Sequence, residues 1–185
     1  IVKLIEAAGG RTLVLFTSYD SLRYSWDIAR TQLRSSGISL LKQGDEDRFK
    51  LLSNFKKIEN SVLFATDSFW EGVDVPGKSL SQVIIVKLPF GVPSDPVFAA
   101  RSQLIKNRGG YPFMELSVPE AVIKFRQGFG RLMRRSDDRG AVIVLDKRIV
   151  ETNYGRIFTS SVPETKKMYG ELTDIVSAVK NHLEE

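Results

Sequence analysis

The chain alternates between short apolar runs and longer segments in which apolar residues recur every three or four positions. Polar positions rarely interrupt the apolar runs, which is typical of strands buried on both faces of a parallel sheet. The predicted strands are Thr12–Phe16, Val62–Ala65, Val83–Leu88 and Ala141–Leu145, with a shorter and weaker one at Ile38–Leu41. Helical spacing between the strands occurs at Leu22, Trp26, Ala29 and Leu33, and again at Phe49, Leu52 and Phe55.

Regular alternation of strands and helices predicts parallel strands joined by helical crossovers. We therefore expect one three-layer α/β domain with a mostly parallel central sheet, spanning residues 1–185. Ligands of such folds bind beyond the carboxyl ends of the strands. The segments to examine are therefore Thr17–Tyr19, Thr66–Asp74, Pro89–Pro96 and the helix after Ser117.

The tetrapeptide Ser-Val-Pro-Glu occurs twice, at residues 117–120 and 161–164. A serine and a glutamate three positions apart, with a proline in the first turn, form a capping-box signature. Each copy therefore predicts the start of a helix.

The first of these helices, taken as Val118–Arg135, carries the sharpest chemical signal. At about 100° per residue, Arg131 and Arg134 lie within about 40° of Gln127, so the three side chains share one face. The opposite face is apolar and comprises Val122, Phe125, Phe129, Leu132 and Met133. Two guanidinium groups on one face suit adjacent oxygens of a polyphosphate, which favours a phosphate site over ordinary solvated arginines.

Gly128 and Gly130 flank the polar face of the same predicted helix. Each glycine costs about 1 kcal/mol relative to alanine in a helix interior. Two such costs in one turn predict that backbone or a ligand approaches closely there.

Composition narrows the chemistry. Hydrophobic residues make up 42% of the chain, which is enough for a real core. The chain has no cysteine, and its one histidine is His182, so disulfides, thiolate metal sites, a cysteine nucleophile and a Ser-His-Asp triad are excluded within it. We expect no metal to be bound by this segment.

The net charge of +5 is concentrated between Lys124 and Arg148, where eight basic residues face three acidic ones. Such a cluster points to phosphate on a nucleotide or a nucleic acid, and the alternative is a solvated helix face. No apolar run approaches the roughly 20 residues that span a bilayer, and no signal peptide is visible. These features predict a cytoplasmic protein without a membrane partner, and the start at Ile1 suggests a piece of a longer chain.

Residues Gly72–Ser79 satisfy the P-loop pattern G-x-x-x-x-G-K-S, but their context argues against a P-loop. A P-loop turns directly from a strand into a helix whose amides hold phosphate. Here the preceding strand ends near Ala65, and the residues that follow are strand-like. The alternative, an autonomous P-loop enzyme that uses Val142–Asp146 as a Walker B strand, predicts that Lys78→Ala abolishes nucleotide binding.

Several motifs together resemble the DinG branch of the XPD/DinG family of superfamily-two DNA helicases. Residues Ala65–Gly77 look like motif V, and Gln127–Arg134 look like motif VI, Q-x-x-G-R-x-x-R. Phe16–Ser18 is similar to motif IV. Further similarity lies in Phe69–Gly72, in Lys87–Pro96, and in Leu145–Arg148 before Tyr154 and Gly155. The resemblance covers nearly the whole chain.

The resemblance implies a second RecA-like domain, which is the C-terminal half of a two-domain ATP-dependent DNA helicase. ATP and Mg²⁺ would be shared with the N-terminal helicase domain of the same chain, which supplies the Walker A lysine and the acidic box. This segment, with no convincing version of either, would be inactive alone. By resemblance, Arg131 and Arg134 would be arginine fingers, Gln127 would sense the γ-phosphate, and Glu71, Gly72 and Asp74 would lie near the nucleotide.

The resemblance also implies single-stranded DNA as a partner. Thr17, Ser18 and Thr66 would contact phosphates without reading sequence. Phe69 and Trp70 would either stack on bases or belong to the core. Ser18 and Thr66 have a second interpretation as caps of helices or turns, and Asp146 is interpreted as a strand-end cap without catalytic chemistry.

A non-catalytic nucleic-acid or protein-interaction module with the same fold is the competing hypothesis. It explains the basic cluster equally well. It does not explain the face formed by Gln127, Arg131 and Arg134 between two glycines.

Overall fold

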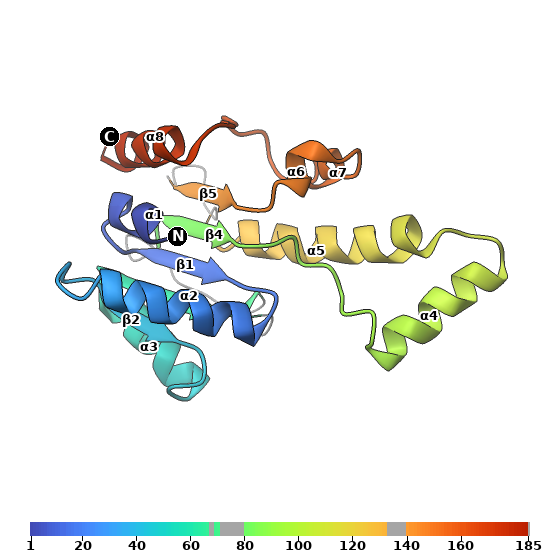
Figure 1. Ribbon diagram of the computed structural model, residues 1–185, viewed down its shortest axis with the longest axis horizontal. Coiled ribbons are helices and arrows are strands. Elements are labelled where there is room, and N and C mark those ends of the chain that lie inside the picture. Colours follow the sequence, from blue (N-terminus) through green and yellow to red (C-terminus); the bar gives the residue numbers. More distant parts are fainter. Residues whose placement is uncertain (67–68, 71–79, 133–139, 185) are drawn as a thin grey trace.

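The computed structural model contains a five-stranded parallel sheet in the order β2-β3-β1-β4-β5 (Figure 1). The structure describes residues 1–66, 69–70, 80–132 and 140–184. In register, Thr12 of β1 lies beside Val62 of β3 and Gln82 of β4. The strands are β1 (Thr12–Leu15), β2 (Ser39–Lys42), β3 (Ser61–Ala65), β4 (Gln82–Ile85) and β5 (Ala141–Val144). The predicted fold class and the five predicted strands are confirmed.

Successive strand residues point to opposite faces of the sheet, and here the residues on both faces are apolar. Helices therefore cover both faces. Leu13 and Leu15 of β1 join one buried cluster, whereas Val14 and Phe16 join the other. The first cluster is closed by α3 (Arg48–Lys57), α5 (Val118–Phe129) and α7 (Gly155–Ser160). The second is closed by α1 (Val2–Ala7), α2 (Tyr19–Gln32) and α8 (Leu172–Glu184). The uninterrupted apolar runs of the sequence follow from this burial on both faces.

Helix α5 begins beyond the carboxyl ends of the strands and runs back toward the sheet (Figure 1). Helix α4 (Pro96–Asn107) and the π-helical turn Phe113–Ser117 precede it and lie away from the sheet. The short α6 (Arg148–Glu151) follows β5. Because α5 returns to the sheet only near its end, the residues of its last turn are the ones that meet the strands.

The two Ser-Val-Pro-Glu copies have different structures. Ser117 has a helical φ of −64° and makes no capping hydrogen bond, since the π-helical turn continues directly into α5. A helix follows as predicted, but the capping mechanism was wrong. No helix begins at residues 161–164. There the Ser161 hydroxyl donates to the carbonyl of Phe158 at 2.7 Å, so it closes α7 instead of opening a new helix.

Candidate functional site

The predicted strand-contact residues lie where β1 and β3 end, at the carboxyl edge of the sheet. Thr17 and Ser18 follow β1, and Thr66 follows β3. Ser18 is the N-cap of α2, with φ −150°, and its hydroxyl oxygen accepts from the backbone N–H of Ser21 at 3.3 Å. The capping interpretation of Ser18 is therefore confirmed. A serine hydroxyl that accepts in this way can still donate its own proton.

Thr66 is held by a residue that the sequence analysis missed, Gln43, which directly follows β2. The Oε1 atom of Gln43 accepts from the backbone N–H of Thr66 at 2.6 Å and from its hydroxyl at 3.1 Å. Thr66 is 7% exposed. That Gln43 follows a predicted strand was a usable signal, but its place beside Thr66 depends on the pairing of β2 with β3, which could not be read from the sequence.

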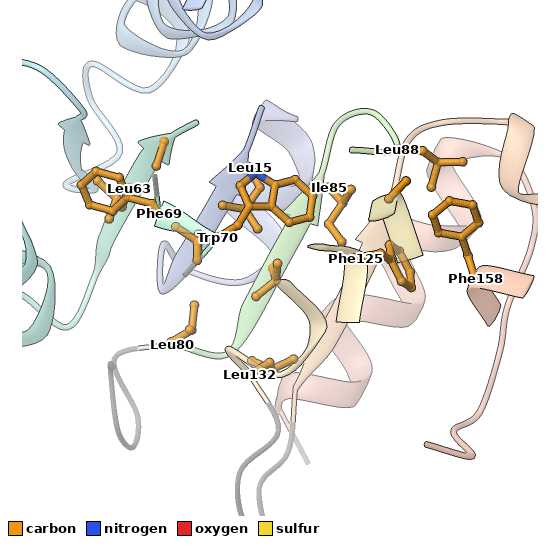
Figure 2. Close-up of a cluster of buried hydrophobic side chains, with 14 of the residues drawn as sticks. Leu15, Leu63, Phe69, Trp70, Leu80, Ile85, Leu88, Phe125, Leu132 and Phe158 are labelled. Atoms are coloured by element: carbon orange, nitrogen blue, oxygen red, sulfur yellow. The ribbon is translucent and has the colours of Figure 1, made fainter. Parts of the chain in front are cut away.

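Phe69 and Trp70 are buried in the first core cluster, with exposures of 2% and 1% (Figure 2). Arg48 of α3 lies over the Phe69 ring, 5.1 Å from its centroid. Rings that are this deeply buried have no face to offer a base. Of the two interpretations of these aromatics, the packing role holds in this structure and the base-stacking role does not.

Gly128 is required by the packing of Trp70. A Cβ atom added at Gly128 would lie 2.9 Å from two carbon atoms of the Trp70 ring and 3.2 Å from Leu15 at the end of β1. A close approach therefore exists at Gly128, but a core indole makes it, and not the backbone or ligand expected from the sequence. Gly130 is the C-cap of α5, and a Cβ there would lie 3.2 Å from the carbonyl oxygen of Arg126.

Gln127 and Arg131 come together at the end of α5, both half-buried. The helix ends at Phe129, earlier than the predicted Arg135, and the backbone N–H of Arg131 bonds to the carbonyl of Gly128 at 3.2 Å. The Nε atom of Arg131 donates to the carbonyl oxygen of Gln127 at 2.9 Å. This bond uses one of the five N–H donors of the guanidinium group and fixes its stem against the helix end.

Asp146 joins the ends of β4 and β5 by hydrogen bonds at the other side of the carboxyl edge. Its carboxylate accepts from the backbone N–H of Leu88, just beyond β4, at 2.9 Å, and from the guanidinium of Arg148 at 2.6 Å. Burial raises the pKa of Asp146, but the hydrogen bonds from Arg148 and Leu88 outweigh burial and hold this pKa below its ordinary value. The prediction that Asp146 is a strand-end cap is confirmed.

Four predicted site residues lie outside the described part of the chain: Glu71, Gly72, Asp74 and Arg134. The P-loop match at Gly72–Ser79 lies outside it too. Residues 80–81 are not helical and β4 begins at Gln82, as expected from the strand-like residues after the match.

Among residues 1–66, 69–70, 80–132 and 140–184, no three His, Cys, Asp or Glu side chains cluster closely enough to hold a metal ion. Within the same ranges, no helix has the length and apolar character that crossing a membrane requires.

Comparison with known sequences identifies the family. The family described as "Helicase C-terminal domain" matches residues 1–165. The Haemophilus influenzae protein named "ATP-dependent DNA helicase YoaA" is 44% identical over 98% of this chain. The Bacillus subtilis protein named "3'-5' exonuclease DinG" is 44% identical over 89% of it. The chain spans only 28% and 18% of the length of these two relatives.

Comparison with solved structures supports the fold. A structure titled "XPD_Helicase" superimposes with a TM-score of 0.65 at 21% identity, over 86% of this chain and 28% of that one. A second, titled "S. cerevisiae Dbp5 bound to RNA and ADP BeF3", superimposes with a TM-score of 0.60 at 16% identity, over 98% of this chain and 41% of that one. The architecture is therefore that of RecA-like helicase domains.

Proposed function

Because the chain belongs to the helicase C-terminal domain family, we propose that it is the second motor domain of an ATP-dependent DNA helicase. The relatives named as ATP-dependent DNA helicases support this proposal, and so does the match along nearly the whole chain. The complete enzyme needs an N-terminal helicase domain, since the chain spans about a quarter of the length of such relatives.

The arrangement of Gln127 and Arg131 is the observation that carries the proposal. Gln127 lies in the last turn of α5, whose apolar residues Phe125 and Phe129 are buried, and Arg131 follows the C-cap Gly130. The bond from Nε of Arg131 to the Gln127 carbonyl limits where the guanidinium can lie. A cation held in place before the reaction stabilises charge on a transferred phosphoryl group without the cost of reorganisation.

The nucleotide would be ATP with Mg²⁺, bound between this domain and the N-terminal one. The donors of Gln127, Arg131 and Arg134 suit the oxygens of a triphosphate. Glu71, Gly72 and Asp74 complete the proposed nucleotide contacts from this domain. The metal ion would take its carboxylate ligands from the N-terminal domain, so this chain alone is not expected to hydrolyse ATP.

Single-stranded DNA would pass the carboxyl edge of the sheet, where Thr17, Ser18 and Thr66 follow strands β1 and β3. Hydroxyl and amide donors at this edge suit backbone phosphates, which carry no sequence information. Closure of the two domains on ATP and their opening after hydrolysis would then move the strand.

The test is Arg131→Ala in the full-length protein. Loss of an arginine finger is expected to lower DNA-stimulated ATPase by about 10³-fold or more, because an uncompensated charge develops in the transition state. Arg126→Ala is the matched control, since Arg126 is an exposed arginine in the last turn of the same helix. Steady-state ATPase and circular dichroism separate a catalytic loss from misfolding.

A non-catalytic module of the same fold makes the opposite prediction for this variant. ATPase that survives Arg131→Ala, or robust ATP turnover by residues 1–185 alone, would contradict the motor proposal. The first result would favour the non-catalytic module, and the second would favour an autonomous nucleotide-hydrolysing domain.

A further inference from the structure

We propose that Phe49, in the first turn of α3, stacks on a base of single-stranded DNA at the carboxyl edge of the sheet. The inference rests on the proposed function, in which the strand passes this edge. It assigns to Phe49 the aromatic contact that Phe69 and Trp70 cannot make, since both are buried.

The exposure of Phe49 is the first observation. The residue is 82% exposed, and among the large apolar residues that the structure describes none is more exposed. A phenyl ring has no hydrogen-bonding group, so its faces can take part only in apolar and π contacts. A nucleic-acid base offers both, and every base has a π face, so the contact needs no particular sequence.

The core does not account for Phe49. Helix α3 packs on the sheet through Leu51 and Phe55, which are buried in the first core cluster. At about 100° per residue, Phe49 lies about 120° around the helix from Phe55 and about 160° from Leu51. The helical spacing of Phe49 with Phe55 in the sequence therefore does not correspond to one buried face, and the ring of Phe49 is directed away from the core.

The position of α3 places this ring at the carboxyl edge. Strand β2 ends there, and α3 begins six residues after the end of β2. The connection lies beside the start of α2, because a Cβ atom at Gly44 would be 3.9 Å from the hydroxyl oxygen of Tyr19. Tyr19 directly follows Ser18, one of the proposed phosphate contacts. A strand that meets Ser18 therefore passes close to the turn that leads to Phe49.

The charges around Phe49 favour a base over a phosphate. Residues 42–50 contain three basic and three acidic side chains, which balance. The contacts of these side chains are Lys42 with Asp45 and Lys50 with Glu46, each at 3.0 Å, Arg48 with the Phe69 ring, and Asp47 with the backbone N–H of Phe49 at 2.9 Å. A phosphate would gain little from such a balanced surface, whereas an uncharged base can stack on the ring.

The experiment measures binding of full-length variants to a fluorescent oligothymidylate without nucleotide. Phe49→Leu keeps the apolar volume but lacks a flat ring, and it is expected to weaken binding about 5-fold or more, as loss of one stacked base does. Phe49→Ala is expected to weaken binding to a similar degree. Phe49→Trp offers a larger ring and is expected to bind at least as tightly as the unaltered protein.

Two further measurements identify stacking as the cause. A synthetic abasic strand of the same length keeps the phosphates but has no bases, so Phe49→Leu and the unaltered protein are expected to bind it equally. A ring releases no counterions, so the slope of log K against log salt concentration is expected to stay the same in Phe49→Leu. Loss of a phosphate contact would reduce that slope by about 0.7.

Tyr169→Leu is the matched control. Tyr169 is a 61% exposed ring in the segment between α7 and α8, and α8 contacts β5, at the opposite side of the sheet from β2. This variant is expected to bind both strands as the unaltered protein does. Thermal unfolding of each variant checks that the fold is retained.

Three results would overturn the inference. Unchanged binding of oligothymidylate by Phe49→Leu would remove the stacking role. An equal loss on the abasic strand would mean that Phe49 acts on the phosphates or on the fold. A lowered unfolding temperature in Phe49→Ala, with both stability and binding restored by leucine, would mean that another part of the full-length protein covers the ring.

Failure of this inference is distinguishable from failure of the proposed function. If Phe49→Leu binds normally while the unaltered protein binds oligothymidylate and Arg131→Ala abolishes ATPase, only the stacking role fails. If the unaltered full-length protein does not bind oligothymidylate, the proposed strand contact fails as well.

Discussion

The carboxyl edge of the sheet and the end of α5 both carry residues expected to meet ligands, and they are held together by different forces. At the edge, side-chain hydrogen bonds join the ends of neighbouring strands, with Gln43 on Thr66 at one side and Asp146 on Leu88 at the other. At the end of α5, the contact is close steric packing, because the Trp70 indole lies where a side chain at Gly128 would be.

The difference predicts how each region fails. Interior packing tolerates little added volume, since the neighbouring atoms have nowhere to go. Side-chain hydrogen bonds between strand ends tolerate added side-chain volume better, but their strength depends on the charge and protonation of the groups. Steric substitutions should therefore affect the end of α5 most strongly, and acid should affect the carboxyl edge.

The largest effect is expected from Gly128→Ala. Two Trp70 carbon atoms lie 2.9 Å from the new Cβ and must shift, which costs about 1–3 kcal/mol of stability. Alanine gains about 1 kcal/mol in helix propensity, so the net change ranges from neutral to about 2 kcal/mol of destabilisation. Amide hydrogen exchange in the full-length protein should show lost protection in α5 and β1. Gly130→Ala, with an ordinary φ of −68°, is the matched control and should change protection by less than about 0.5 kcal/mol. Equal effects at both glycines would refute the packing role.

A smaller effect is expected at the edge from Asp146→Asn, about 1 kcal/mol, because the Arg148 side chain is 43% exposed and solvent screens its charge. The folded-state pKa of Asp146 lies below its ordinary value of 3.8, so the stability that it contributes is present above that value. This stability is lost as pH falls through the lowered pKa. Hydrogen exchange or thermal unfolding across that range should show the unaltered protein and Asp146→Asn converging in acid. A stability difference between the two proteins that stays constant with pH would contradict a stabilising role of the Asp146 carboxylate.

The smallest effect is expected from Ser18→Ala, about 0.5 kcal/mol in the first turn of α2, since the capping bond from Ser21 is long at 3.3 Å and exposed. Exchange of the first amides of α2 measures it. Unchanged exchange would mean that Ser18 is not an effective cap.

Particular residues show how far the sequence could be interpreted. The five strands were predictable because burial on both faces leaves apolar runs that local periodicity reveals. The proximity of Gln127 and Arg131, where the Nε atom of Arg131 donates to the Gln127 carbonyl, was predictable from their spacing of four residues. The end of α5 was not, because Gly130 caps the helix before Arg131 in a way that the helical repeat alone does not show.

The two Ser-Val-Pro-Glu copies mark the limit of local signals. The same four residues continue a helix after a π-helical turn in one place and close α7 in the other. A serine hydroxyl can accept or donate, and the neighbouring carbonyls decide which it does. The assignments of Phe69 and Trp70 depended in the same way on what covers them.

The sequence by itself determined the strands, their alternation with helices, the motifs and thus the family, because these depend on residues close together in the chain. Only the tertiary structure decided which groups from distant segments meet: Gln43 with Thr66, Leu88 with Asp146, and Trp70 with Gly128. Hydrogen bonding and packing act over a few ångströms of space, so the contacts of a side chain are set by the strand order and by the return of α5 to the sheet. The residues next to a side chain in the sequence specify neither the strand order nor the path of α5.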